Sequence, residues 1–139
     1  MYVYYNNNYQ HKLVGDCVIR ALSAFLGQEW QTTYIELCVK DYELADMPSS
    51  NAVWNEYLRN KGYQRTVIKS DCPDCITVRE FAKRFDKGRY FLFVGEHVIC
   101  LIDGRYLDTW DSGDKVVEYY YAKRQTPDIS PAHAKEVTL

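Results

Sequence analysis

Hydrophobic residues recur at helical spacing through the first part of the chain and form strand-like runs through the last part. Helices are expected over 17–26, from about 29 to Met47-Pro48, from a cap at Ser49 or Ser50 to Gly62, and from Thr77 to Gly88. Strands are expected over 63–69, 90–94, 97–102, 105–109 and 116–121. This order predicts an α+β fold, in which N-terminal helices pack on a C-terminal antiparallel β-sheet.

Residues with special backbone or capping roles mark the ends of several elements. Asp16 can cap the first helix, and Gly27 can end it because the residue after a helix often adopts a left-handed conformation. Thr77 and Glu80 have the spacing of a capping box. Asp103-Gly104 is a residue pair that a two-residue hairpin turn favours. Local sequence therefore predicts the boundaries of two helices and one hairpin.

The length and composition are those of one domain. The chain has 139 residues, of which 47% are hydrophobic, and this is enough for one sizeable core. We expect a single domain over residues 1–122, in which the segment through His11 forms an edge strand or a loop. Residues 123–139 contain Pro127 and Pro131 and no hydrophobic period, so we expect a loose tail.

Charge and hydropathy argue against two classes of partner. The 17 basic and 19 acidic residues leave no strongly basic balance of the kind that nucleic-acid binding usually requires. No hydrophobic run approaches membrane-spanning length, and the first residues have neither the basic nor the apolar part of a signal peptide. We therefore expect no nucleic-acid partner, no membrane association and a cytoplasmic protein.

The five cysteines are an odd number scattered over helical, loop and strand segments. This pattern differs from the even framework of a small secreted domain and favours free thiols in a reducing compartment. The spacing of Cys72 and Cys75 also occurs in redox dithiols, but Thr77 caps the next helix only after both thiols. A zinc site there would need two further ligands, so we expect no metal and no cofactor.

Cys17 and His97 are the two residues whose positions point to chemistry. Cys17 begins the first helix, where the positive end of the helix dipole and unpaired N–H groups lower the pKa of a thiol. His97 begins a strand of the sheet on which that helix is expected to pack. Taken singly, each would more often be an inert core thiol or a structural histidine. Together they predict a thiolate nucleophile with an imidazole partner, as in covalent acyl-transfer enzymes.

The hairpin turn decides which carboxylate faces His97. A two-residue turn at Asp103-Gly104 places His97 opposite Trp110 and puts Asp108 on the same face as a diagonal neighbour. A three-residue turn would reverse the alternation and favour Asp111. We expect Asp108 to orient the imidazole, and we expect its replacement by alanine to lower activity with little effect on stability.

These residues resemble those of papain-like cysteine peptidases, in which the cysteine begins the central helix, the histidine begins a strand and Asn or Asp follows one strand later. Asp108-Thr109-Trp110 is similar to the Asn-Ser-Trp of that family, whose Trp shields the contact between His and Asn. Asp16-Cys17 is similar to the Asp-Cys of bacteriocin-processing peptidases. Over nearly its full length the chain resembles small proteins of bacteriophages and prophages, which share GDCVIRA and the HV…DG…DTWD hairpin. The resemblance implies a papain-like fold and, for a phage-encoded protein, the host cytoplasm.

The resemblance also implies a glutamine about six residues before the nucleophile that donates a hydrogen bond to the oxyanion. His11 occupies that position here and the glutamine is Gln10, so a one-residue bulge would be needed to restore it. Gln10 is the expected oxyanion residue, with Asn8 and His11 as alternatives. The backbone N–H of Cys17 is the expected second donor and needs no particular side chain.

These observations predict a small cysteine hydrolase, whether peptidase, isopeptidase or amidase, that acts on a protein or peptide substrate. Cys17, His97 and Asp108 would form its catalytic triad, and water would release the acyl-enzyme. Two alternatives stay open. One is a catalytically inactive papain-like module that binds proteins, and the other is an acyl transferase that uses the same triad with an amine acceptor.

Overall fold

The computed structural model describes residues 1–47 and 50–122, and the predicted tail lies outside them. The helices are α1 (Cys17–Leu26), α2 (Trp30–Leu44), α3 (Asn51–Asn60) and α4 (Val78–Arg84). The strands are β1 (Tyr2–Tyr4), β2 (Arg65–Val67), β3 (Arg89–Phe93), β4 (Val98–Ile102), β5 (Arg105–Asp108) and β6 (Tyr119–Ala122). The last strand begins later than predicted, because Val116 makes only an isolated bridge with Thr77.

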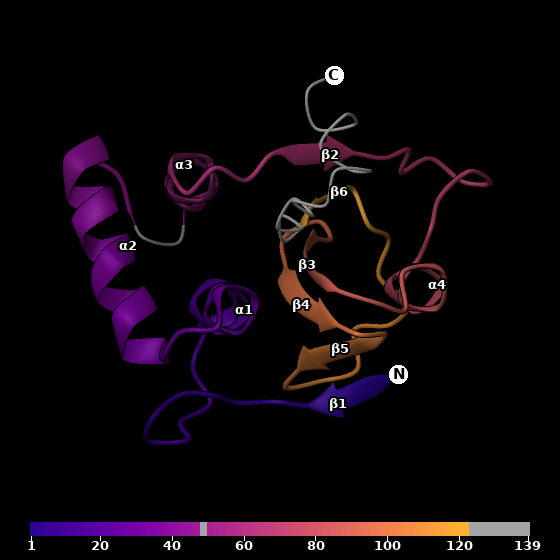
Figure 1. The fold of residues 1–139 in the computed structure, drawn as a ribbon, viewed down its shortest axis with the longest axis horizontal. Helices are drawn as coiled ribbons and strands as arrows, with labels where there is room; N and C mark the ends of the chain where they lie inside the picture. The colour runs from indigo at the N-terminus through magenta and orange to yellow at the C-terminus, as the bar shows by residue number, and fades with distance from the viewer. Residues whose placement is uncertain (48–49, 123–139) are drawn as a thin grey trace, which may run out of the picture.

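These strands belong to one sheet in the order β1-β5-β4-β3-β6-β2 (Figure 1). β1 pairs with β5 in parallel, and the other pairings are antiparallel. The sheet is therefore mixed, and the prediction of an antiparallel sheet was wrong at this edge. The N-terminal segment forms an edge strand, which is one of the two structures expected for it. Its partner is β5, which lies in the C-terminal part of the domain.

Helices cover both faces of the sheet, so the prediction of helices on one face was incomplete. The helical layer of α1, α2 and α3 lies on one side and α4 on the other (Figure 1). Successive residues of β4 alternate between two hydrophobic clusters, because side chains of a strand point to opposite faces. Val98 and Cys100 pack in the cluster of α1, while Ile99 and Leu101 pack in the cluster of α4.

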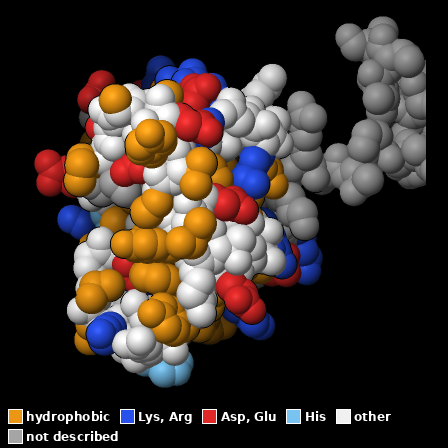
Figure 2. Space-filling model, turned by 90° about the vertical axis from the view of Figure 1, so that its left-hand side faces the viewer, with side chains coloured by type: hydrophobic (Ala, Val, Ile, Leu, Met, Phe, Trp, Pro, Cys, Tyr) orange, Lys and Arg blue, Asp and Glu red, His pale blue; other side chains and the backbone are white. Residues whose placement is uncertain are grey.

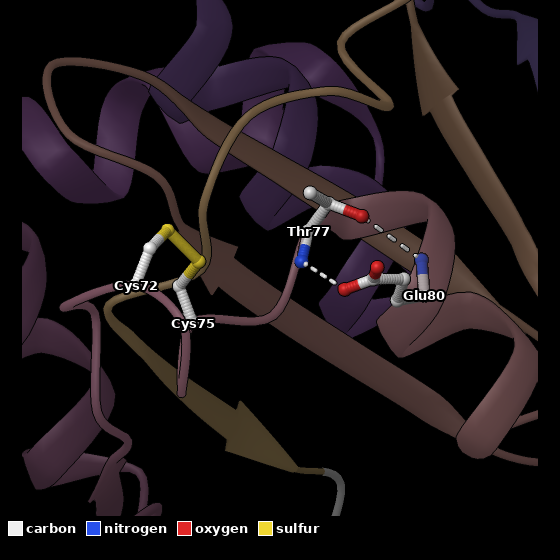
Figure 3. Close-up of a disulfide and its surroundings, with 4 residues drawn as sticks. All are labelled: Cys72, Cys75, Thr77 and Glu80. Atoms are coloured by element: carbon white, nitrogen blue, oxygen red, sulfur yellow. Dashed lines mark hydrogen bonds between the residues drawn. A yellow bond between two sulfur atoms is a disulfide. The ribbon is translucent and has the colours of Figure 1, made fainter.

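The local signals at element ends are confirmed except for the cap at Asp16, whose side chain makes no cap hydrogen bond. α1 begins at Cys17, and Gly27 after it has a left-handed conformation with φ of 67°. Thr77 and Glu80 form both hydrogen bonds of a capping box at the start of α4 (Figure 3). Asp103 and Gly104 both have positive φ, at 48° and 77°, in a two-residue turn between β4 and β5. The hairpin register on which the site depends is therefore the predicted one.

The cysteines differ from the prediction of five free thiols. Cys72 and Cys75 form a disulfide in the loop before α4 (Figure 3), and their Cα atoms are 4.6 Å apart. Cys17, Cys38 and Cys100 are free. Whether two nearby cysteines pair depends on how the loop between them brings their Cβ atoms together, and residue spacing does not determine this.

Candidate functional site

The N-terminus of α1 presents Cys17 without the usual side-chain cap. Asp16 precedes the helix, but its carboxylate bonds no backbone N–H of the first turn. One oxygen instead pairs with Arg20, and the other accepts a hydrogen bond from the indole of Trp30 at 2.8 Å. The first N–H groups of α1 are thus not consumed by the cap residue and can stabilise an anion at Cys17.

His97 and Asp108 meet at one end of the β4–β5 hairpin. Nε2 of His97 lies 2.6 Å from Oδ2 of Asp108. The expectation that Asp108 rather than Asp111 contacts the imidazole is confirmed, because the turn has two residues and the alternation of the strands is kept. Asp111 instead accepts hydrogen bonds from the Tyr106 hydroxyl and the Gly113 N–H.

Cys17 and His97 perturb each other's pKa in the directions expected of an ion pair. Burial alone would raise the pKa of Cys17, but hydrogen bonding and charge from His97 outweigh it and hold that pKa below its usual value. Burial likewise disfavours a charged His97, yet hydrogen bonds with Asp108 and Cys17 raise its pKa to about 9. Both shifts favour a thiolate beside an imidazolium at neutral pH.

Asp108 is fully buried and its carboxylate is completely paired. His97 and the Ser112 hydroxyl bond one oxygen, at 2.6 and 2.8 Å. Arg20 and the Thr109 N–H bond the other, at 3.0 and 2.8 Å. Burial would raise the pKa of Asp108, but the partners, His97 first, lower it below the ordinary value. The group therefore stays ionised and can hold a charged imidazole in one orientation.

Arg20 connects the helix of the nucleophile to the orienting carboxylate. Its side chain is 6% exposed, and its guanidinium pairs with Asp16 and with Asp108. A charge buried this deeply must be paired, so Arg20 joins the two segments that carry Cys17 and Asp108. Sequence reasoning missed this role. The available signal was one arginine in a largely apolar helix, four residues after an aspartate. Nothing in the sequence marked Ser112.

The ring of Trp110 packs against the imidazole of His97. Its ring centroid lies 4.9 Å from that of His97, and the side chain is 44% exposed at the surface. The side chain of His97 is only 15% exposed. Trp110 therefore packs beside the imidazole, and the shielding role that the resemblance implies for it stays a prediction.

Gln10 and Asn8, two of the three expected oxyanion residues, line a different cavity from that of the nucleophile. Gln10 is exposed and, with Asn8 and Trp30, lines a groove of about 490 Å³. Cys17 lines a separate pocket of about 220 Å³. His11, the second alternative, is exposed and has positive φ of 56°. The oxyanion role of Gln10 stays a prediction, and the uncapped N–H groups of α1 are the donors nearest in sequence to Cys17.

The outer face of α2 beside this groove carries exposed hydrophobic side chains. They gather in a band on that side of the molecule (Figure 2). The exposed members on α2 are Tyr34, Ile35, Val39, Tyr42 and Leu44. The buried residues of α2 are Thr33 and Leu37, so much of the hydrophobic surface of this helix is left exposed.

Among residues 1–47 and 50–122, no group of His, Cys, Asp and Glu side chains could hold a metal ion. No helix in this part of the chain is long and apolar enough to cross a membrane. No family model, curated protein or solved structure matches the chain. Any functional proposal therefore rests on the geometry around Cys17 and on the residues quoted above.

Proposed function

We propose that this protein is a cysteine hydrolase that cleaves an amide bond, with Cys17 as nucleophile, His97 as acid and base, and Asp108 as orienting group. The observations that support the proposal are the 2.6 Å contact of His97 with Asp108 and the uncapped start of α1 at Cys17, where His97 lowers the pKa of the thiol. The papain-like fold, and a peptide, isopeptide or other amide as substrate, belong to the same proposal.

Acylation begins from the ion pair. The thiolate of Cys17 attacks the carbonyl carbon, a C–S bond forms, and the carbonyl electron pair moves to oxygen. The oxyanion develops against the first N–H groups of α1, where preorganised donors stabilise it most. Nε2 of His97 is held by Asp108, so Nδ1 carries the proton that passes to the amide nitrogen as the C–N bond breaks. The amine leaves and a thioester remains.

Deacylation reverses these roles. A water molecule gives its proton to Nδ1 of His97 while its oxygen attacks the thioester carbon. The C–S bond then breaks, the carboxylic acid leaves, and the thiolate and imidazolium are restored. Asp108 stays ionised in both steps, because its hydrogen bonds lower its pKa. It keeps Nε2–H engaged so that Nδ1 continues to face the sulfur.

Alkylation by iodoacetamide at neutral pH, mapped by mass spectrometry, tests the nucleophile. We expect Cys17 to react about tenfold or more faster than Cys38, because each unit of pKa changes the thiolate fraction about tenfold. Cys38 is the matched control, since it is a free, partly exposed thiol whose pKa is raised by burial and by Asp41. His97→Ala should remove the advantage of Cys17, and Cys17→Ser should abolish hydrolysis of a peptide library. Equally slow labelling of Cys17 and Cys38 would contradict the proposal.

A further inference from the structure

The pocket beside Cys17 has walls suited to a substrate side chain. Its volume is about 220 Å³, and Cys17 itself forms part of its wall. Much of the remaining wall is apolar and comes from helices and strands: Val18, Ile19, Trp54, Phe93 and Val98. The polar residues of the lining are Asp16, which pairs with Arg20, together with Asn51 and Glu96. Trp54 and Val98 are buried core residues, so this part of the wall is held rigidly by the packing of α3 and β4.

The volume sets the size of the group that fits. An apolar cavity of about 150 Å³ is sufficient for benzene. The pocket therefore has room for a single aromatic ring or a branched aliphatic side chain, and it is smaller than the roughly 300 Å³ at which pockets for whole drug-sized ligands begin. One side chain, rather than an entire small molecule, matches this space.

The position of the pocket indicates which part of the substrate it holds. A leaving amine must lie against His97, because the imidazolium supplies its proton. The ring of His97 is turned towards Asp108 and Trp110 and is not part of the pocket wall, although its neighbours Glu96 and Val98 are. The wall is instead formed by Cys17 and by α3 as well as these neighbours. A group in the pocket is therefore on the acyl side, the part that remains bonded to Cys17 after the amine has left.

Glu96 gives the pocket a second basis for selection, which is the charge of the substrate side chain. It lines the same pocket, is exposed, and precedes His97 in the turn between β3 and β4. Within the described ranges 1–47 and 50–122, none of the ion pairs includes Glu96. A free carboxylate beside an apolar cavity repels a substrate carboxylate and leaves neutral side chains unaffected.

We infer that this pocket selects the residue whose carbonyl Cys17 attacks, accepting a neutral apolar side chain and rejecting an acidic one. The inference rests on the proposed function, because it takes Cys17 as the nucleophile. It assigns the walls from α1, α3, β3 and β4 as the specificity surface and Glu96 as the residue that excludes acidic substrates.

A series of N-acetyl amino-acid chloromethyl ketones tests the assignment on the full chain. In each reagent the thiolate displaces chloride and forms a thioether, so only the side chain differs. Rates of Cys17 modification are measured by mass spectrometry, with iodoacetamide as a reagent that has no side chain. The Phe and Leu ketones should react about ten to a hundred times faster than the Gly ketone, as burial of one such side chain provides. The Asn ketone should react faster than the isosteric Asp ketone.

Two variants locate these effects. Val18→Phe fills the pocket and should remove the preference for Phe and Leu over Gly, with each ketone rate taken relative to the iodoacetamide rate of the same variant. Val39→Phe makes the same substitution on the exposed face of α2 and should change nothing. Glu96→Gln should bring the Asp and Asn ketones to equal rates.

The possible failures are distinguishable. Rapid, His97-dependent labelling of Cys17 by iodoacetamide with equal rates for the Gly, Leu and Phe ketones would overturn the pocket assignment and leave the hydrolase proposal standing. A preference for Phe and Leu that survives Val18→Phe would also overturn it. Slow labelling of Cys17 by every reagent would overturn the proposed function, and the assignment with it.

Discussion

Replacing Asp108 by asparagine removes one negative charge from the centre of the site with little change in shape. Asp108 is fully buried and pairs with His97 and Arg20. An amide oxygen can still accept a hydrogen bond, but it does not stabilise a charged imidazole as a carboxylate does. We therefore expect a lower pKa for His97 and a higher pKa for Cys17.

The structure indicates the size of the effect. The pKa of His97 is raised from 6.5 to about 9, and this corresponds to about 3 kcal/mol in favour of the imidazolium. Asp108 is the first of the partners that produce this rise against burial. An opposite charge in contact changes a pKa by about 1–3 units, so the variant should lose much of the rise. The reactive thiolate of Cys17 at neutral pH should then decrease about tenfold or more.

The assay is the rate of Cys17 alkylation by iodoacetamide between about pH 5 and pH 10. In Asp108→Asn the midpoint of the rate profile should move to higher pH. Asp111→Asn is the matched control, because Asp111 is exposed and bonds Tyr106 and Gly113 instead of His97. Identical profiles for the wild type and Asp108→Asn, or equal displacements in the two variants, would refute the reasoning.

Two further predictions concern stability. Arg20→Gln leaves buried carboxylates without their cation, so we expect a loss of about 3–5 kcal/mol and a thermal midpoint about 10 °C or more lower by circular dichroism. Arg59→Gln, at an exposed ion pair, should cost under about 1 kcal/mol, and equal shifts for the two variants would contradict the role of Arg20. In denaturant unfolding between about pH 6.5 and 8.5, the wild type should show little pH dependence from this pair, because folded thiolate–imidazolium and unfolded thiol–imidazole each hold one proton. In Cys17→Ser the contribution of the thiolate is lost, but Asp108 still raises the pKa of His97. Stability should then be full below about pH 6.5 and fall as pH rises through the folded pKa, and a variant as flat as the wild type would be inconsistent with the role of Asp108.

The buried ion pair of Asp108 with Arg20 argues against the expectation that an Asp108→Ala variant would keep its stability. The expectation treated Asp108 as a polar residue at a strand end. The carboxylate is instead buried against Arg20, and removing it would leave that guanidinium with Asp16 as its single carboxylate partner. We now expect a substantial stability cost, so activity losses must be compared at temperatures where the variant is folded.

Local sequence alone determined the features that depend on a few neighbouring residues. The start and end of α1, the capping box of Thr77 and Glu80, and the turn at Asp103-Gly104 each arise from backbone preferences and hydrogen bonds within about four positions. The turn also determined which side chains face each other across the hairpin, because its length sets the alternation of side chains in both strands. This is why the contact of His97 with Asp108 could be predicted.

Only the tertiary structure decided which distant segments meet. The parallel pairing of β1 with β5, the bond from Arg20 to Asp108 and the pocket between α1, α3 and β3 all depend on how complete elements dock. Docking satisfies burial and charge pairing summed over the whole domain, and several arrangements are compatible with the same local preferences. For the same reason Asp16 could be recognised as the residue before the helix, while the turning of its carboxylate towards Arg20 and Trp30 could not.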